Sequence, residues 1–188
     1  MNKNNITFAI LCGLAVSWIA FDFFEIYGWI FFIILPILSV VGLWMAEVVG
    51  RKILFVHQAG RFALAGAFAD VIDIKVFQLL ILFAPFSITF KAISFLVATF
   101  IKYWANKYWA FDTSPEQKKI FWDNQMAYFF LITAGGLALN VFSFYYLNKI
   151  QTSISSHLWT ELSIIFAALV AAIWNFLGYK FIVFKKQI

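Results

Sequence analysis

Six long apolar runs separated by short polar segments make up most of this chain. They cover residues 6–24, 29–49, 61–83, 87–104, 126–147 and 158–178. Most approach the ~20 apolar residues that an α-helix needs to cross the hydrocarbon core of a bilayer. The pattern therefore predicts an all-α membrane protein with six transmembrane helices. Pro36, inside the second run, is a candidate kink.

The first run also has features of a secretory signal peptide. It follows a lysine and contains the small residues Ala15 and Ser17. Bulky apolar side chains nevertheless continue through Trp18, Phe21 and Phe24, and no exported domain follows. We expect a spanning helix instead.

Composition supports a membrane location. Of the 188 residues, 64% are hydrophobic and only 12% are charged, whereas a soluble domain carries about 25% charged residues. The net charge of +5 would suit a nucleic-acid partner, but the cations lie at the ends of the predicted helices, where they set membrane topology. No nucleic-acid binding is expected, and the single cysteine, Cys12, forms no internal disulfide.

The distribution of basic residues predicts the orientation, because cytoplasmic loops are enriched in lysine and arginine. If both termini are cytoplasmic, that side receives Lys3, Arg51, Lys52, Arg61, Lys107, Lys118, Lys119, Lys180, Lys185 and Lys186. The opposite side receives only Lys149 and the border residue Lys91. We therefore expect cytoplasmic N and C termini.

The chain contains an internal duplication. Residues 100–111, FIKYWANKYWAF, return as residues 173–184, IWNFLGYKFIVF, and each copy places a lysine among aromatic rings where an apolar run ends. Upstream, residues 61–67 align with residues 128–134, and Asp73 aligns with Asn140 at the same offset of 67 residues (140 minus 73). An N-terminal hairpin is thus followed by two repeated hairpins. The predicted orientation makes them parallel, unlike the inverted repeats of many transporters.

These motifs resemble the GtrA-like family of small membrane proteins. Its halves open with Arg-Phe-apolar-Gly, carry an acidic residue further on, and close with Asn-Phe-x-x-Asn-Arg-x-Trp-x-Phe. The resemblance covers residues 58–186 and leaves residues 1–57 unmatched. We therefore divide the chain into an N-terminal hairpin, 1–57, and a four-helix domain, 58–188, with halves 58–111 and 125–186. The departures from the family pattern are Lys102, Lys107, Tyr128, Tyr179 and Ile182.

Several polar residues are predicted at membrane depth, where a charged side chain costs roughly 2.5–3.5 kcal/mol and normally faces protein or water. Asp70 and Asp73 share one face of the third helix, and Lys102 lies on the fourth. Asn140 and Asn175 lie in the second half. These groups either line a polar groove or hydrogen-bond neighbouring helices beside small residues. Lys75 points away from the aspartates, and an acidic group on another helix is its expected partner.

Three cations form a second candidate set, namely Arg61, Lys107 and Lys180. They are either interfacial anchors or a clamp for a phosphate group. Asn106 and Asn175 would then offer neutral hydrogen bonds suited to sugar hydroxyls.

Other chemistry finds little support in the sequence. There is no phosphate-binding glycine loop. The predicted topology places His57 and His157 on opposite sides of the membrane, so they cannot share a metal. We expect no enzymatic activity, no cofactor and no metal.

The family resemblance implies translocation of a polyprenyl-phosphate-linked monosaccharide across the plasma membrane for cell-surface polysaccharide glycosylation, beside a membrane glycosyltransferase. The expected substrate-binding residues are Arg61, Asp70, Asp73, Lys102, Asn106, Lys107, Asn140, Asn175 and Lys180. One alternative is a non-transporting anchor or scaffold for the glycosyltransferase, because similar modules are fused to dolichol-phosphate mannose synthases. A small-solute or ion transporter is a third possibility, and a homodimer is plausible.

Overall fold

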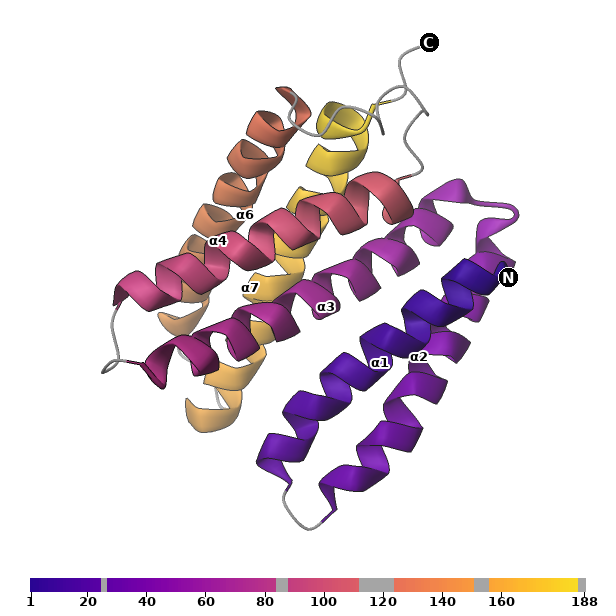
Figure 1. Ribbon diagram of the computed structural model, residues 1–188. Coiled ribbons are helices and arrows are strands. Elements are labelled where there is room, and N and C mark those ends of the chain that lie inside the picture. The colour runs from indigo at the N-terminus through magenta and orange to yellow at the C-terminus, as the bar shows by residue number, and fades with distance from the viewer. Residues whose placement is uncertain (25–26, 84–87, 112–123, 151–155, 186–188) are drawn as a thin grey trace. The chain divides into compact units, whose positions relative to one another are not determined.

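The computed structural model describes residues 1–24, 27–83, 88–111, 124–150 and 156–185. In these ranges the chain is almost entirely helical and contains no strand. It forms two compact units, which we call unit 1 (Met1–Asp112) and unit 2 (Thr113–Ile188). Figure 1 shows the helices of both units. The boundary falls between the two repeated halves, in the polar segment that follows the first.

Unit 1 contains four α-helices and a short π-helical turn. The elements are α1 (Lys3–Phe23), α2 (Gly28–Gly50), α3 (Leu54–Ile81), α4 (Ile88–Ala105) and η1 (Asn106–Ala110). Helix α1 packs against both α2 and α3, and α3 also packs against α2, α4 and η1. Helix α3 is therefore the central element of the unit, and α3 and α4 run side by side (Figure 1).

Unit 2 is a single helical hairpin with its own π-helical turn. It consists of α6 (Asn124–Asn148), α7 (Ser156–Gly178) and η2 (Tyr179–Val183). Helices α6 and α7 pack along each other, and η2 packs against both (Figure 1). The hairpin is closed by glycines: a Cβ on Gly136 would lie 2.4 Å from Oδ1 of Asn175, and a Cβ on Gly178 would lie 2.5 Å from Cγ2 of Ile132. Each glycine thus leaves room for a side chain of the partner helix.

The six predicted helices are confirmed within the described residues, although α3 begins at Leu54, seven residues before the predicted start at Arg61 (61 minus 54). Four segments are long and apolar enough to cross a membrane: Lys3–Asp22, Gly28–Gly50, Asn124–Leu147 and Ile165–Val183. Helices α3 and α4, for which the sequence predicts charged residues at membrane depth, are not among these four. Their passage through the membrane stays a prediction. Lys118, Lys119, Lys186 and the side chain of His157 lie outside the described residues.

Helices α1 and α2 approach most closely where a glycine faces a proline. A Cβ on Gly13 would lie 2.4 Å from Cα of Pro36 and 2.8 Å from the carbonyl carbon of Leu35. Helix α2 is continuous through Pro36, which is buried against α1. The proline therefore forms part of the helix contact without interrupting the helix.

The duplication is visible in the backbone of the two units. Each repeated hairpin ends in a π-helical turn whose last hydrogen bond spans five residues. The N–H of Phe111 donates to the carbonyl of Asn106 at 3.0 Å, and the N–H of Phe184 donates to the carbonyl of Tyr179 at 2.7 Å. Short π-helical segments are rare and are often found at functional sites. Both aromatic-cationic motifs of the sequence adopt this conformation.

Corresponding aromatic rings also pack alike in the two halves. Phe111 contacts Phe62 with ring centroids 6.3 Å apart, and Phe184 contacts Phe129 with centroids 6.3 Å apart. Both closing phenylalanines are buried. Each pair joins the opening segment of a hairpin to its closing turn, so the aligned motifs occupy corresponding places in their own units.

The N-terminal hairpin supplies the partner of Lys75. The ammonium of Lys75 lies 2.5 Å from a carboxylate oxygen of Asp22, near the end of α1, and 4.5 Å from the ring centroid of Trp18. The expectation of an acidic partner on another helix is confirmed. This ion pair joins α1 to α3.

The Gly13–Pro36 contact predicts the stability of two alanine variants. Gly13→Ala places a methyl group against backbone atoms that cannot rotate away, so we expect the free energy of unfolding to fall by about 1–3 kcal/mol. Gly42→Ala is the matched control, because a Cβ there has no atom within 4 Å outside its own helix. It should leave stability unchanged or raise it by up to about 1 kcal/mol. Thermal unfolding of the purified protein in detergent measures both, and equal effects would contradict the close contact.

Candidate functional site

A polar cluster joins α3 to α4. One carboxylate oxygen of Asp73 accepts a hydrogen bond from the ammonium of Lys91 at 2.5 Å, and the other accepts one from the hydroxyl of Ser94 at 2.6 Å. The side chain of Asp73 is 19% exposed, whereas that of Lys91 is 48% exposed. Both carboxylate oxygens of Asp73 therefore have hydrogen-bond partners on α4. These bonds fix how α3 and α4 are aligned along each other.

Asp70 lies one turn from Asp73, and its charge interacts with lysines of α4. Its side chain is exposed although it lies in the middle of α3, and its charge interacts with that of the half-buried Lys102 on α4. An exposed carboxylate is expensive in hydrocarbon, so at membrane depth it must face water, protein or a polar ligand. This face of α3 is therefore the part of unit 1 least suited to contact with lipid chains.

Arg61 lies on α3, twelve residues before Asp73, and contacts η1 and α2. One guanidinium nitrogen, Nη1, donates to the carbonyl of Trp109 at 3.1 Å, and the guanidinium carbon lies 5.7 Å from the Trp109 ring centroid. The other nitrogen, Nη2, lies 4.0 Å from Oε1 of Glu47. Arg61 therefore connects η1 to α2, an element outside the repeated halves.

Asn5 completes this connection. Its amide Nδ2 donates to Oε1 of Glu47 at 2.6 Å, and its Oδ1 accepts a hydrogen bond from the indole nitrogen of Trp109 at 3.0 Å. The ring of Phe8 lies 4.1 Å from that of Trp109, centroid to centroid. Both helices of the N-terminal hairpin therefore contact the residues around Arg61.

The polar residues of η1 itself are wholly buried. Lys107 donates from its ammonium to the hydroxyl of Tyr103 at 3.1 Å, and neither side chain is exposed. Asn106 donates to the carbonyl of Lys102 at 2.7 Å. Its Oδ1 has no hydrogen-bond partner among the described residues. An unsatisfied buried oxygen costs about 1–3 kcal/mol, so this atom is a candidate acceptor for a ligand donor.

The polar groups of α3 extend over a considerable depth. Arg61 and Asp73 are 12 residues apart (73 minus 61) on a continuous helix, which corresponds to about 18 Å at 1.5 Å per residue. The hydrocarbon core of a bilayer is about 30 Å thick. The charged groups of α3 are therefore spread along much of the helix, and Arg61 and Asp73 contact different neighbouring elements.

Unit 2 contains the three remaining predicted residues. Asn140 is half-buried on α6, whereas Asn175 is buried and packs on Gly136 as described above. The ammonium of Lys180 lies 5.8 Å from the ring centroid of Phe176 and 5.6 Å from that of Phe181. Lys180 is half-buried. It is thus more accessible than Lys107, its counterpart in the first half.

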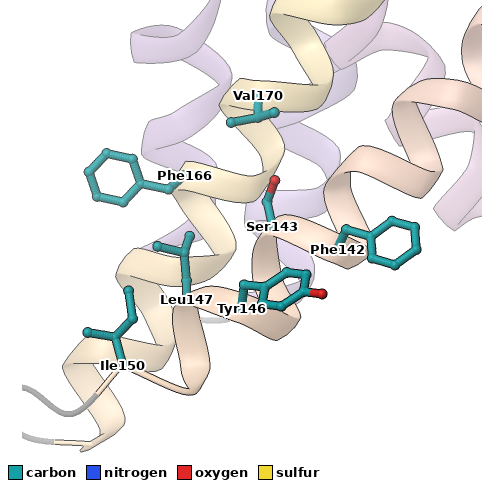
Figure 2. Close-up of a pocket in the computed structure, with 7 residues that line it drawn as sticks. All are labelled: Phe142, Ser143, Tyr146, Leu147, Ile150, Phe166 and Val170. Carbon is teal, nitrogen blue, oxygen red and sulfur yellow. The ribbon is translucent and has the colours of Figure 1, made fainter.

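An apolar pocket of about 440 Å³ lies between α6 and α7. Figure 2 shows the residues that line it, which are Phe142, Ser143, Tyr146, Leu147, Ile150, Phe166 and Val170. Lys149 lies in the same part of the chain, with its ammonium 4.1 Å from the ring centroid of Tyr145. The lining suits a hydrocarbon group rather than a sugar.

The described structure thus places six of the nine predicted residues in unit 1 and three in unit 2. In unit 1, Asp70 and Lys102 interact, whereas Asp73 and Arg61 each engage other partners. Sequence reasoning did not single out Glu47 or Asn5. The sequence could have indicated Glu47, because it is the only charged residue in the second apolar run. Among the described residues, no group of three or more His, Cys, Asp or Glu side chains could hold a metal ion.

Comparison with known proteins identifies the family. No curated protein matches the chain, and no solved structure matches it. The family model described as "GtrA/DPMS, transmembrane domain" matches residues 61–184, which include both repeated hairpins and begin at Arg61. The matched segment covers about two thirds of the chain. The chain therefore belongs to the GtrA/DPMS transmembrane-domain family.

Proposed function

We propose that this protein translocates a polyprenyl-phosphate-linked monosaccharide across the plasma membrane for cell-surface polysaccharide glycosylation. The observation that carries the proposal is the exposed carboxylate of Asp70 beside Lys102, at mid-depth on α3 of a GtrA/DPMS-family chain. A sugar headgroup crossing a bilayer needs such a polar surface, because its hydroxyls lose their hydrogen bonds to water. Helix packing alone does not require an exposed carboxylate there.

The proposed binding residues divide according to the two parts of the headgroup. Contacts with the lipid phosphate are assigned to Arg61 and Lys107 within unit 1 and to Lys180 within unit 2, since guanidinium and ammonium groups form strong charge-assisted hydrogen bonds with phosphate oxygens. Contacts with the sugar hydroxyls are assigned to Asp70, Asp73, Lys102 and Asn106 within unit 1 and to Asn140 and Asn175 within unit 2. The polyprenyl chain stays in lipid, where apolar surfaces such as the α6–α7 pocket can contact it.

Binding of phosphate by Lys107 requires a local rearrangement. Lys107 is buried and its ammonium contacts the hydroxyl of Tyr103. We place this rearrangement in η1, the π-helical turn that carries Lys107. In this mechanism phosphate replaces Tyr103 as the partner of the ammonium.

We further propose that the termini are cytoplasmic and that the chain itself catalyses no covalent reaction. Without an energy source, net translocation would follow consumption of the sugar on the far side of the membrane. A membrane glycosyltransferase that charges the lipid on the cytoplasmic side is the expected partner.

A second candidate function is a non-transporting anchor or scaffold for that glycosyltransferase. The family description favours the scaffold, because the description names GtrA together with DPMS, the dolichol-phosphate mannose synthases. The two functions differ in what the polar residues do. A scaffold depends on its outer surfaces and tolerates neutral substitutions at Asp70 and Lys102, whereas a translocator does not.

Neutral substitutions on the α3–α4 face test translocation directly. We expect Asp70→Asn and Lys102→Gln each to slow translocation by about tenfold to a hundredfold. Loss of a hydrogen bond to a charged group costs about 1.5–3 kcal/mol, and 1.4 kcal/mol corresponds to a factor of ten. The measurement is the rate at which a labelled polyprenyl-phosphate-sugar becomes accessible on the outer face of liposomes containing the purified protein.

Asp22→Asn provides the matched control for this experiment. It also neutralises a carboxylate paired with a lysine in unit 1, but it lies near the end of α1. Its translocation rate should stay within about twofold of the wild type. Normal rates in the Asp70 and Lys102 variants, or no transport by the wild type together with retained binding to the glycosyltransferase, would favour the scaffold.

The proposed orientation can be tested with single cysteines. Cys12 is 1% exposed and should resist labelling, so Cys12→Ser gives a cysteine-free background. In that background Lys149→Cys should react with a membrane-impermeant maleimide in intact cells. Lys185→Cys should react only after permeabilisation. The reverse pattern would place the termini outside and overturn the proposed direction.

A further inference from the structure

A polar pocket of about 390 Å³ opens at the end of unit 1 where α1, α2 and α3 meet. In Figure 1 the N-terminus lies at the same end of the unit as the connection between α2 and α3. The polar side chains that line the pocket are Asn2, Asn5, Glu47, Arg51, His57 and Arg61. All but Arg61 precede the segment matched by the family model, which begins at residue 61. The N-terminal hairpin therefore builds most of this pocket.

The charges of the pocket are unbalanced. Two arginines, which remain protonated in proteins, face a single carboxylate, that of Glu47. Nη2 of Arg61 and Nε2 of His57 each lie 4.0 Å from Oε1 of Glu47, which is too far for a hydrogen bond. Oε1 of Glu47 also accepts a hydrogen bond from the neutral amide of Asn5 at 2.6 Å, and its Oε2 lies 3.5 Å from the amino terminus of Met1, which lines the pocket as well. The lining therefore carries more positive than negative charge.

Two helix N-termini add to this positive character, and the C-terminus of α2, whose last residue Gly50 also lines the pocket, opposes them in part. Helix α1 begins after Asn2, and α3 begins three residues before His57. Neither N-cap residue caps its helix through a side chain, and neither first turn contains an acidic residue. The free N–H groups of a helix N-terminus and the positive end of its dipole both favour an anion.

We propose that this pocket binds the phosphate group of a phosphorylated ligand. Arg51 and Arg61 would contact the phosphate oxygens, because the guanidinium group can donate two parallel hydrogen bonds to a phosphate. Asn2 and Asn5 would hydrogen-bond the hydroxyl groups next to it. The phosphate can belong to a lipid headgroup or to a free phosphorylated sugar. The inference goes beyond the proposed translocation, because a scaffold could hold the same ligand.

The negative charge of Glu47 predicts whether its substitution strengthens or weakens ligand binding. In a phosphate site its carboxylate repels the ligand while it positions Asn5 and Arg61. Glu47→Gln retains an oxygen acceptor for Asn5 and removes the negative charge, so it should strengthen phosphate binding. If the pocket instead bound a cation or an uncharged sugar, the same substitution would weaken binding or leave it unchanged.

The test uses the full-length protein in nanodiscs of neutral phosphatidylcholine. Two probes distinguish the sources of phosphate: glucose 1-phosphate, which is water-soluble, and a short-chain polyprenyl phosphate, which partitions into the bilayer. Affinities are measured by isothermal titration calorimetry for the wild type and for Arg51→Gln, Glu47→Gln and Lys52→Gln. Lys52 is the matched control, since it is an exposed cation next to Arg51 that does not line the pocket.

We expect Arg51→Gln to weaken binding about three- to tenfold, the range for a partly solvated contact between a cation and a phosphate. Lys52→Gln should leave the affinity nearly unchanged, and Glu47→Gln should raise it. Binding of both probes supports a site for free phosphate esters, and binding of the lipid probe alone supports a headgroup site. Absence of binding to the wild type, or equal effects of Arg51→Gln and Lys52→Gln, would overturn the proposal. Equal effects of Arg51→Gln and Lys52→Gln overturn the pocket alone and leave the proposed function standing, whereas absence of polyprenyl phosphate binding counts against both.

Discussion

The high cost of an unpaired charge in hydrocarbon is the constraint on which this structure depends. Helix α3 carries four charged side chains along its length: Arg61, Asp70, Asp73 and Lys75. Three of them reach hydrogen-bonding or ion-pairing partners on other elements, supplied by α1, α2, α4 and η1. Asp70 is the exception: it interacts with Lys102 but stays exposed. The packing of unit 1 therefore accounts for the buried charges and leaves one polar face available for function.

The N-terminal hairpin has a physical role although it precedes the family-matched segment. It supplies Asp22 to one end of α3 and Glu47 to the other. Asn5 adds a direct link to Trp109 of the first π-helical turn. Its two strongly apolar helices, α1 and α2, also provide surface suited to lipid contact. The hairpin thus both pairs the charges of α3 and contributes its own polar pocket.

The two repeated halves keep a common backbone but have diverged in chemistry. Asn106 of the first turn bonds a backbone carbonyl and retains an unsatisfied oxygen, whereas its counterpart Tyr179 hydrogen-bonds the hydroxyl of Thr133 at 2.6 Å. Lys107 is buried, whereas Lys180 is half-buried beside phenylalanine rings. The second hairpin is held in part by close contacts at Gly136 and Gly178. Unit 1 therefore carries most of the charged chemistry of the candidate site.

The sequence by itself determined the six helices, the duplication and the family. The helices follow from run length and turn residues within each segment. The duplication and the family follow from motifs whose residues and spacing can be compared along the chain without knowing any contact. Contacts between distant segments were decided only by the tertiary structure. Lys75 meets Asp22 across 53 residues and Arg61 meets Trp109 across 48, and no local pattern encodes such a pairing. The burial of Lys107 was likewise decided by packing, because η1 lies against α3 and α4 and encloses a lysine whose local sequence suggested an interfacial position.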